Sequence, residues 1–160
     1  MKENKYSFLL AIIIFFCDRI SKHIIFKLSE PLGEFQIMIT SNLNFNLLWN
    51  KGIAFGLFSF HEDIYYNSLT GIIIAITFVI LLLMIKSKGI EKLGFTFVLG
   101  GSLGNIYDRL YHSAVIDFID FHFNNHHWFV FNIADIFITL GIISLIYVEF
   151  FFKNKPVNNE

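Results

Sequence analysis

The sequence predicts an all-α membrane protein: four transmembrane helices, with a small extracytoplasmic β or amphipathic element in the first outer loop. The 160 residues are 55% hydrophobic and only 16% charged, whereas soluble domains have about 25% charged residues. The mean hydropathy of +0.60 also indicates more apolar surface than a globule of this size can bury. We expect one integral membrane domain over residues 1–160.

Four stretches have the composition of membrane-spanning helices, each of which needs roughly 20 mostly apolar residues. They cover about residues 8–26, 67–85, 93–110 and 128–152. The second includes the uncharged run GIIIAITFVILLLMI at 71–85, and the third is rich in glycine. Loops over about 27–66 and 111–127 connect these stretches on one side.

Lysine positions predict the orientation of the chain. Seven lysines fall on the opposite side from the two long loops: Lys2, Lys5, Lys86, Lys88, Lys92, Lys153 and Lys155. Basic residues accumulate in short cytoplasmic segments, so both termini should be cytoplasmic and the long loops should face outward. Residues 35–49 of the first loop partly alternate apolar with polar, as a half-exposed strand does. The Asn- and aromatic-rich stretch near residues 122–127 is expected to be loop.

Ionisable and amide side chains occur inside the expected spans, where a charge costs about 2.5–3.5 kcal/mol on insertion scales. They are Asp18, Arg19 and Lys22 in the first span, Asn105, Asp108 and Arg109 at the end of the third, and Asn132 and Asp135 in the fourth. Spacings of three and four place the members of each group on one helical face. Three helices should therefore direct polar side chains inward, toward the outer halves of the spans.

Asp117 and Asp135 differ from the other carboxylates. Neither has a cation three or four residues away, and both lie in apolar surroundings, with Asp135 about seven residues inside the fourth span. Unpaired carboxylates that approach each other share a proton. The ionised member can then take a proton from water while its protonated partner polarises a carbonyl group, with no metal required. The alternative for each charge is an ion pair that only holds helices together, as Asp18 and Lys22 suggest.

Five motifs occur in order along the chain: DRISK at 18–22, NKGIAFGLF at 50–58, GGSLGNIYDR at 100–109, VIDF at 115–118 and FNIAD at 131–135. On these motifs the chain resembles the bacterial lipoprotein signal peptidases, the signal peptidase II family of aspartic peptidases. The resemblance extends over nearly the whole sequence. Three positions depart from the family pattern, namely Arg19, Ile53 and Ile136.

The resemblance implies an endopeptidase of the bacterial cytoplasmic (inner) membrane that cuts diacylglyceryl-modified prolipoproteins on the N-terminal side of the lipidated cysteine. Its catalytic pair would be Asp117 and Asp135, near the outer face of the membrane, without metal or cofactor. Residues that would bind substrate or support the pair are Asp18, Lys22, Asn50, Gly52, Asn105, Asp108, Arg109 and Asn132. The implied partners are the prolipoprotein and membrane lipid, and we expect a monomer.

Other functions predict different outcomes. The net charge of −1 provides no basic patch for nucleic acid. A small channel or transporter would place its charges along an axial path, and a structural membrane protein would lose only stability when they are replaced. A zinc site at His122 and His126 is a weaker alternative, and the Gly100–Gly104 spacing favours close helix packing.

Overall fold

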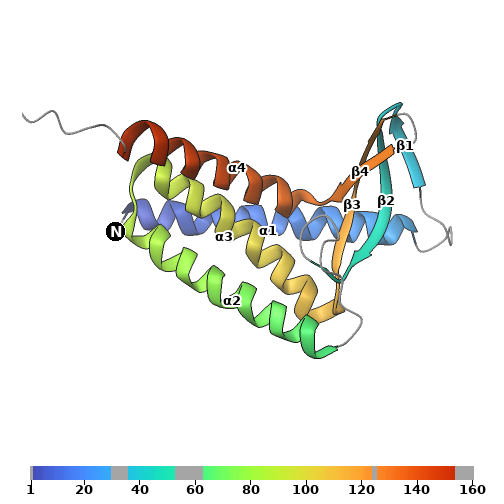
Figure 1. Ribbon diagram of the computed structural model, residues 1–160, viewed down its shortest axis with the longest axis horizontal. Coiled ribbons are helices and arrows are strands. Elements are labelled where there is room, and N and C mark those ends of the chain that lie inside the picture. Colours follow the sequence, from blue (N-terminus) through green and yellow to red (C-terminus); the bar gives the residue numbers. More distant parts are fainter. Residues whose placement is uncertain (1, 30–35, 53–62, 124–125, 154–160) are drawn as a thin grey trace, which may run out of the picture.

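The computed structural model describes residues 2–29, 36–52, 63–123 and 126–153, which form helices and a small sheet. The elements in chain order are α1 (Lys2–Ser29), β1 (Gln36–Thr40), β2 (Leu43–Asn50), α2 (Asp63–Lys86), α3 (Gly89–His112), β3 (Val115–Phe123), β4 (His126–Phe131), α4 (Ile133–Val148) and the short π-helix η2 (Glu149–Lys153). The N-terminus, the α2–α3 connection and the end of α4 lie at one end of the helices, and the sheet lies at the other (Figure 1).

Helix α3 is the centre of the bundle and packs against α1, α2 and α4. Glycines permit this close packing. A Cβ at Gly100 would lie 2.9 Å from the Ala11 carbonyl oxygen of α1, and one at Gly101 would lie 2.5 Å from the Ala134 carbonyl oxygen of α4. A Cβ at Gly104 would lie 2.6 Å from an Asp18 carboxylate oxygen. The expected role of the Gly100–Gly104 pair in close helix packing is confirmed.

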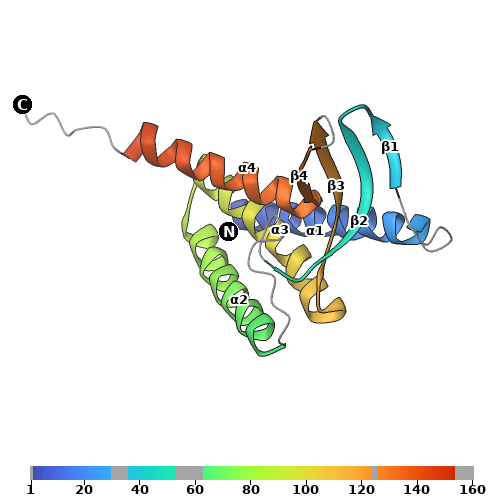
Figure 2. The ribbon, with the colours of Figure 1, turned by 45° about the vertical axis from the view of Figure 1, so that its right-hand side comes forward.

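The four strands form one antiparallel sheet in the order β1-β2-β3-β4. Figure 2 shows this curved sheet crossing the C-terminal part of α1, with β4 leading directly into α4. Ile25 of α1 packs with Phe118 and Ile119 of β3 in a buried cluster that joins the helices to the sheet. The sheet is therefore anchored to the bundle beside the first turn of α4.

The expected helices near 8–26, 67–85 and 93–110 correspond to α1, α2 and α3, each longer than predicted. A strand in the first loop is confirmed by β1 and β2, but two further strands belong to the same sheet. The expectation of loop near residues 122–127 was wrong at 122–123 and 126–127, where His122 pairs with His127 and Phe123 with His126 as β3 and β4; residues 124–125 lie outside the described residues. Among the described residues, two helices are long and apolar enough to cross a membrane, over Ile64–Lys86 and Ile133–Phe152.

The predicted start of the fourth helix, near residue 128, was also wrong. Residues His126–Phe131 form β4, and Asn132 then caps α4. Asp135 is consequently in the first turn of α4, not about seven residues inside it. Some sequence predictions fall outside the described residues: Ile53 and the rest of its motif to residue 58, Lys155, and the side chains of Lys2, His126 and Lys153.

Candidate active site

Asp117 lies on the part of β3 that is buried between the helices and β2. Its side chain is 1% exposed. Its Cα partner on β2 is Leu48, and Asn50 follows at the end of that strand. The Asn50 amide donates a hydrogen bond of 2.9 Å to Asp117 Oδ2, and its own Oδ1 accepts one of 2.8 Å from the Gly52 backbone N–H. The amide is thus fixed at both ends.

Asp135 lies at the N-terminus of α4 and takes part in a capping box with Asn132. The Asn132 side chain accepts a hydrogen bond of 3.0 Å from the Asp135 N–H, and Asp135 Oδ2 accepts one of 3.2 Å from the Asn132 N–H. Such reciprocal bonds satisfy the free N–H groups of a helix start. The cap explains why α4 begins here and why the Asp135 carboxylate is held beside the end of β4.

Two asparagine amides connect the carboxylates to each other. Asn132 Nδ2 donates to Asp117 Oδ1 at 2.6 Å and to Asn105 Oδ1 at 3.2 Å. Asn105 Nδ2 then donates to Asp135 Oδ1 at 2.9 Å. The structure therefore brings Asp117 and Asp135, which come from a strand and a helix, into one hydrogen-bonded group with Asn50, Asn105 and Asn132.

The surroundings of Asp117 favour its protonated form. Burial raises the pKa of this carboxyl group from 3.8 to about 7, and the negative charge of Asp135 adds to the increase. Hydrogen bonds from Asn50 and Asn132 act in the opposite direction, because they stabilise the carboxylate. The two aspartates are thus coupled electrostatically, and Asp117 exchanges its proton near neutral pH.

A second buried cluster contains Asp18, Arg19, Lys22 and Asp108. Lys22 Nζ lies 2.9 Å from Asp18 Oδ2 and 2.8 Å from Asp108 Oδ2. Arg19 bridges the same two carboxylates, at 2.7 Å to Asp18 and 2.5 Å to Asp108. Asp18 and Asp108 are 0% exposed and Lys22 is 1% exposed. Two carboxylates and two cations give this cluster a net charge of zero.

The ion cluster contacts the backbone directly beside both aspartates of the other group. Asp18 Oδ1 accepts a hydrogen bond of 3.1 Å from the N–H of Ala134, which precedes Asp135. Asp108 Oδ2 accepts one of 3.2 Å from the N–H of Ile116, which precedes Asp117. Lys22 also donates to Asn105 Oδ1 at 3.0 Å. The ion cluster therefore fixes the positions of β3 and α4 relative to α1 and α3.

Arg109 and Gly52 contact each other beside the C-terminal turn of α3. Arg109 is 5% exposed and donates from Nη2 to the Gly52 carbonyl oxygen. Its guanidinium carbon lies 5.4 Å from the ring centre of Tyr66 on α2, within the range of a cation–π contact. These contacts attach Gly52, in the first loop, to the C-terminal turn of α3.

Sequence reasoning did not place Arg19 in the ion cluster and did not single out the buried carboxylate of Asp120. Arg19 was noted as a charge in the first span and as a departure from the family pattern, but it was not assigned to the site, although it is adjacent to Asp18. Asp120 is 0% exposed on β3, three residues after Asp117, and its Cα partner on β2 is Asn44. A second aspartate on a predominantly apolar strand could have been noticed only if the strand itself had been predicted.

Comparisons with known proteins agree with this architecture. The family described as Signal peptidase (SPase) II matches residues 10–152. A lipoprotein signal peptidase from Pelagibacter ubique (strain HTCC1062) is 46% identical over 160 residues, covering 100% of this chain and 96% of the relative. One from Francisella tularensis subsp. novicida (strain U112) is 41% identical over 154 residues, covering 92% and 93%.

Two solved structures, both described as bacterial membrane enzymes, have the same fold. The first has a TM-score of 0.72 at 24% identity and covers 98% of this chain and 94% of its own. The second has a TM-score of 0.70 at 25% identity and covers 94% and 95%. The family match and the full-length relatives together show that this chain belongs to the signal peptidase II family, the lipoprotein signal peptidases, which are aspartic peptidases.

Proposed function

We propose that Asp117 and Asp135 are the catalytic pair with which the chain removes signal peptides from diacylglyceryl-modified prolipoproteins, on the N-terminal side of the lipidated cysteine. One contrast supports this pair. Asp18 and Asp108 each contact two cations, whereas Asp117 and Asp135 are hydrogen-bonded by neutral amides. A carboxylate without a paired cation remains free to exchange a proton.

The pair supports general acid–base catalysis of peptide hydrolysis. Because burial and Asp135 raise the pKa of Asp117 to about 7, the singly protonated form of the pair is populated at neutral pH. The ionised carboxylate takes a proton from water, whose oxygen attacks the scissile carbonyl carbon. The protonated carboxyl group donates its proton to the carbonyl oxygen, which gives a tetrahedral diol. Collapse of the diol breaks the C–N bond, and a proton from the pair moves to the leaving amine of the lipidated cysteine.

The three asparagines that contact the pair are proposed to orient the carboxylates. Asn50 and Asn132 each direct one N–H to Asp117, and Asn105 directs one to Asp135. These donors disfavour rotation of the carboxylates when substrate enters. Asp135 is half-buried while Asp117 is buried, so the accessible side of the pair lies toward Asp135.

The remaining predicted site residues are proposed to act through the pair. Asp18, Lys22 and Asp108 are positioning residues, because they hold the backbone next to the catalytic aspartates. Arg109 holds Gly52 and therefore the end of β2, where Asn50 contacts Asp117. All of these groups come from one chain, which is why we propose that a monomer is active.

We also propose that all four long helices span the bacterial inner membrane, with both termini cytoplasmic and the pair near the outer face. Arg19 and Lys22, in the C-terminal half of α1, contact Asp108 of α3, and the other face of α1 exposes apolar side chains such as Leu9 (52%), Ile13 (49%) and Ile20 (58%). Labelling a Lys88→Cys, Cys17→Ser variant with a membrane-impermeant thiol reagent tests the orientation. Reaction only from the cytoplasmic side is expected, and reaction only from the outer side would reverse the proposed orientation.

The catalytic assignment is tested with purified protein in lipid and a diacylglyceryl-cysteine precursor. Asp117→Asn and Asp135→Asn should each abolish processing, since removal of either carboxylate eliminates the acid–base pair. Asp120→Asn is the matched control, because Asp120 is an equally buried carboxylate on the same strand as Asp117. This control should retain processing.

Cooperative thermal unfolding of each variant would show that the variant is folded, so that its loss of processing comes from the missing carboxyl group. Full processing by both Asp117→Asn and Asp135→Asn would exclude the proposed pair. Equal loss in Asp120→Asn, with all three variants poorly folded, would instead favour a purely structural role for the buried carboxylates.

A further inference from the structure

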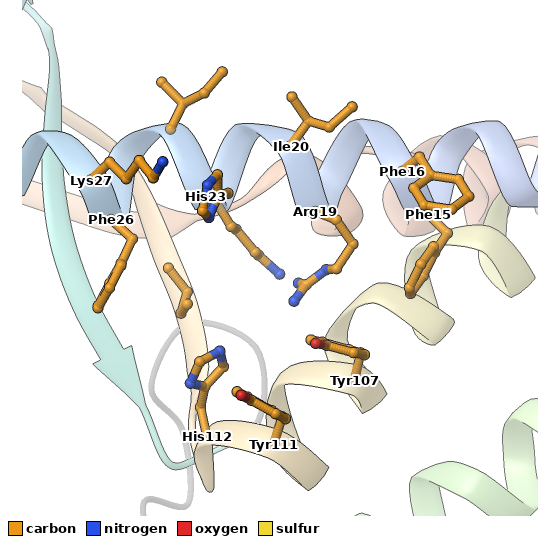
Figure 3. Close-up of a pocket in the computed structure, with 13 residues that line it drawn as sticks. Phe15, Phe16, Arg19, Ile20, His23, Phe26, Lys27, Tyr107, Tyr111 and His112 are labelled. Atoms are coloured by element: carbon orange, nitrogen blue, oxygen red, sulfur yellow. The ribbon is translucent and has the colours of Figure 1, made fainter.

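A cavity of about 630 Å³ lies between α1 and the C-terminal turns of α3, apart from the aspartate pair (Figure 3). In Figure 3, Arg19 and Phe26 point from α1 toward α3, where Tyr107, Tyr111 and His112 form the facing wall. Ile116 of β3 also lines the cavity. Successive strand residues point to opposite faces, so Asp117, the next residue, is directed away from it.

Basic residues follow one face of α1 along the cavity. Arg19, His23 and Lys27 are each four residues apart and all line it. Arg19 is neutralised by Asp18 and Asp108, but His23 and Lys27 are exposed and form no ion pair with a described residue. The uncompensated positive charge of the cavity therefore comes from Lys27, and His23 adds an imidazole one turn before it.

Aromatic rings line the same cavity, and Trp49 packs against two of the lining rings from outside it. Tyr107 stacks on Tyr111 with 5.6 Å between ring centres, and Tyr111 contacts His112 at 4.8 Å. His112 contacts Trp49 of β2 at 5.5 Å, and Trp49 contacts Phe26 of α1 at 6.2 Å. Tyr and Trp side chains favour the headgroup level of a bilayer. In the proposed orientation, this group of rings lies at the outer leaflet and adds hydroxyl and imidazole donors beside Lys27 and His23.

An apolar stripe runs beside the basic one. Phe16, Ile20 and Ile24 repeat at the same spacing of four and are 54%, 58% and 51% exposed. All three also line the cavity. A ligand that places a negative headgroup against Lys27 and His23 could thus extend hydrocarbon along these three side chains.

We infer that this cavity binds the phosphate-bearing headgroup of an anionic glycerophospholipid from the outer leaflet. The acyl chains lie on the Phe16–Ile20–Ile24 stripe, and the phosphate lies between Lys27, His23 and the tyrosine hydroxyl groups. The diacylglyceryl group of a prolipoprotein carries no phosphate, so it has no negative charge for Lys27 and His23 to bind. The site is thus a resident-lipid site beside the substrate site, and it depends on the proposed membrane orientation but not on the proposed catalytic pair.

Fluorescence of Trp49 provides a direct test. A Trp128→Phe variant leaves Trp49 as the single tryptophan, since the chain has two. It is reconstituted in phosphatidylcholine nanodiscs with a small fraction of brominated phosphatidylglycerol or brominated phosphatidylcholine. The brominated anionic lipid should quench Trp49 with about a fivefold preference over the zwitterionic lipid, the effect of one lysine near an anionic lipid.

The site is located by substitution. His23→Gln with Lys27→Gln should abolish the preference, while Lys88→Gln, an exposed lysine at the opposite end of the bundle, should retain it. Unchanged preference in the double variant, or equal quenching by both lipids, would overturn the inference. Relief of quenching by soluble sn-glycerol 3-phosphate would also overturn it in favour of a soluble phosphate ligand. Processing of a diacylated precursor, measured on the same samples, reports separately on the catalytic proposal.

Discussion

Two pairs of aspartates lie side by side in this molecule, and they differ in the groups that contact their carboxylates. In the ion cluster, Asp18 and Asp108 each contact both Arg19 and Lys22. In the proposed catalytic group, Asp117 and Asp135 contact the amides of Asn50, Asn105 and Asn132. Cations hold a carboxylate in its ionised form, whereas burial without a paired cation raises the pKa of Asp117 to about 7 despite its amide donors.

The two aspartate pairs should therefore contribute differently, one to the stability of the fold and the other to proton transfer. The ion cluster contacts backbone N–H groups on β3 and α4, so its charges join four elements of the fold. In the proposed catalytic group, the pKa of Asp117 is raised to about 7, which means that the folded protein disfavours the ionised form of this carboxyl group. We therefore expect loss of a carboxylate to lower stability in the ion cluster, and to weaken the pH dependence of stability in the catalytic group.

The largest effect is expected from Asp108→Asn. The substitution leaves Arg19 and Lys22 with one carboxylate, Asp18, and hence one excess buried positive charge. Breaking a buried ion pair in this way costs about 3–5 kcal/mol. Equilibrium unfolding in mixed micelles would measure the loss. Glu149→Gln, at an exposed position on η2, serves as a control and should change stability by less than about 0.5 kcal/mol. Comparable losses in the two variants would remove the proposed distinction between the clusters.

A somewhat smaller effect is expected in the pH dependence of stability. Asp117 has a pKa of about 7 when folded against 3.8 as the ordinary value, so the unfolded chain releases this proton first as pH rises. The contribution of Asp117 to the free energy of unfolding should fall by about 1.4 kcal/mol per pH unit between the two pKa values, and it should level off above the higher pKa.

Unfolding of the parent chain and of Asp117→Asn at pH 5, 6 and 7 would measure this contribution as the difference between the two slopes. The asparagine side chain does not titrate, so the variant should lose less stability over this range. Parallel slopes would show that the pKa of Asp117 is not raised in the folded protein.

The pH profile of processing should also respond to the amides. Asn50 donates to Asp117 and lowers its pKa, so Asn50→Leu should move the alkaline limb of kcat/KM to higher pH while lowering its maximum. Asn46→Leu, on the same strand β2, changes an asparagine that makes no hydrogen bond to Asp117 among the described contacts. Its alkaline limb should match that of the parent. If the alkaline limb of Asn50→Leu lay at the same pH as that of the parent, ionisation of Asp117 would not be the step that causes it.

The contacts between residues three or four positions apart in one helix were predictable from the sequence. Asp18 and Lys22 lie four apart in one helix, so their pairing follows from helical geometry. The contact between Asn132 and Asp135 also follows from local geometry once α4 is known to begin at residue 133. That boundary was missed, because an aromatic and apolar strand has the same composition as the start of a spanning helix.

Contacts between distant segments were not predictable from periodicity. The link from Asn50 to Asp117 depends on the register of β2 and β3, which includes an irregularity between Phe45 and Leu48. Arg19 was missed as a member of the ion cluster because its second partner, Asp108, is 89 positions away. The resemblance to signal peptidase II supplied the candidate site residues, but the structure was needed to separate those that contact the aspartate pair from those that fix the backbone beside it.

The smallest effect on stability, yet a clear one on activity, is expected from Asn132→Ser. Serine caps helices nearly as well as asparagine, so the start of α4 should be retained and stability should change by less than about 1 kcal/mol. The shorter side chain cannot supply the amide N–H that Asn132 donates to Asp117 and Asn105. Processing should therefore fall by about 10-fold or more, in proportion to one lost charge-assisted hydrogen bond. Asn132→Ala, which lacks both functions, should lose activity and stability together. If Asn132→Ser processed precursor at the parent rate, Asn132 would be a helix cap only, and the amide link between the two aspartates would be dispensable for catalysis.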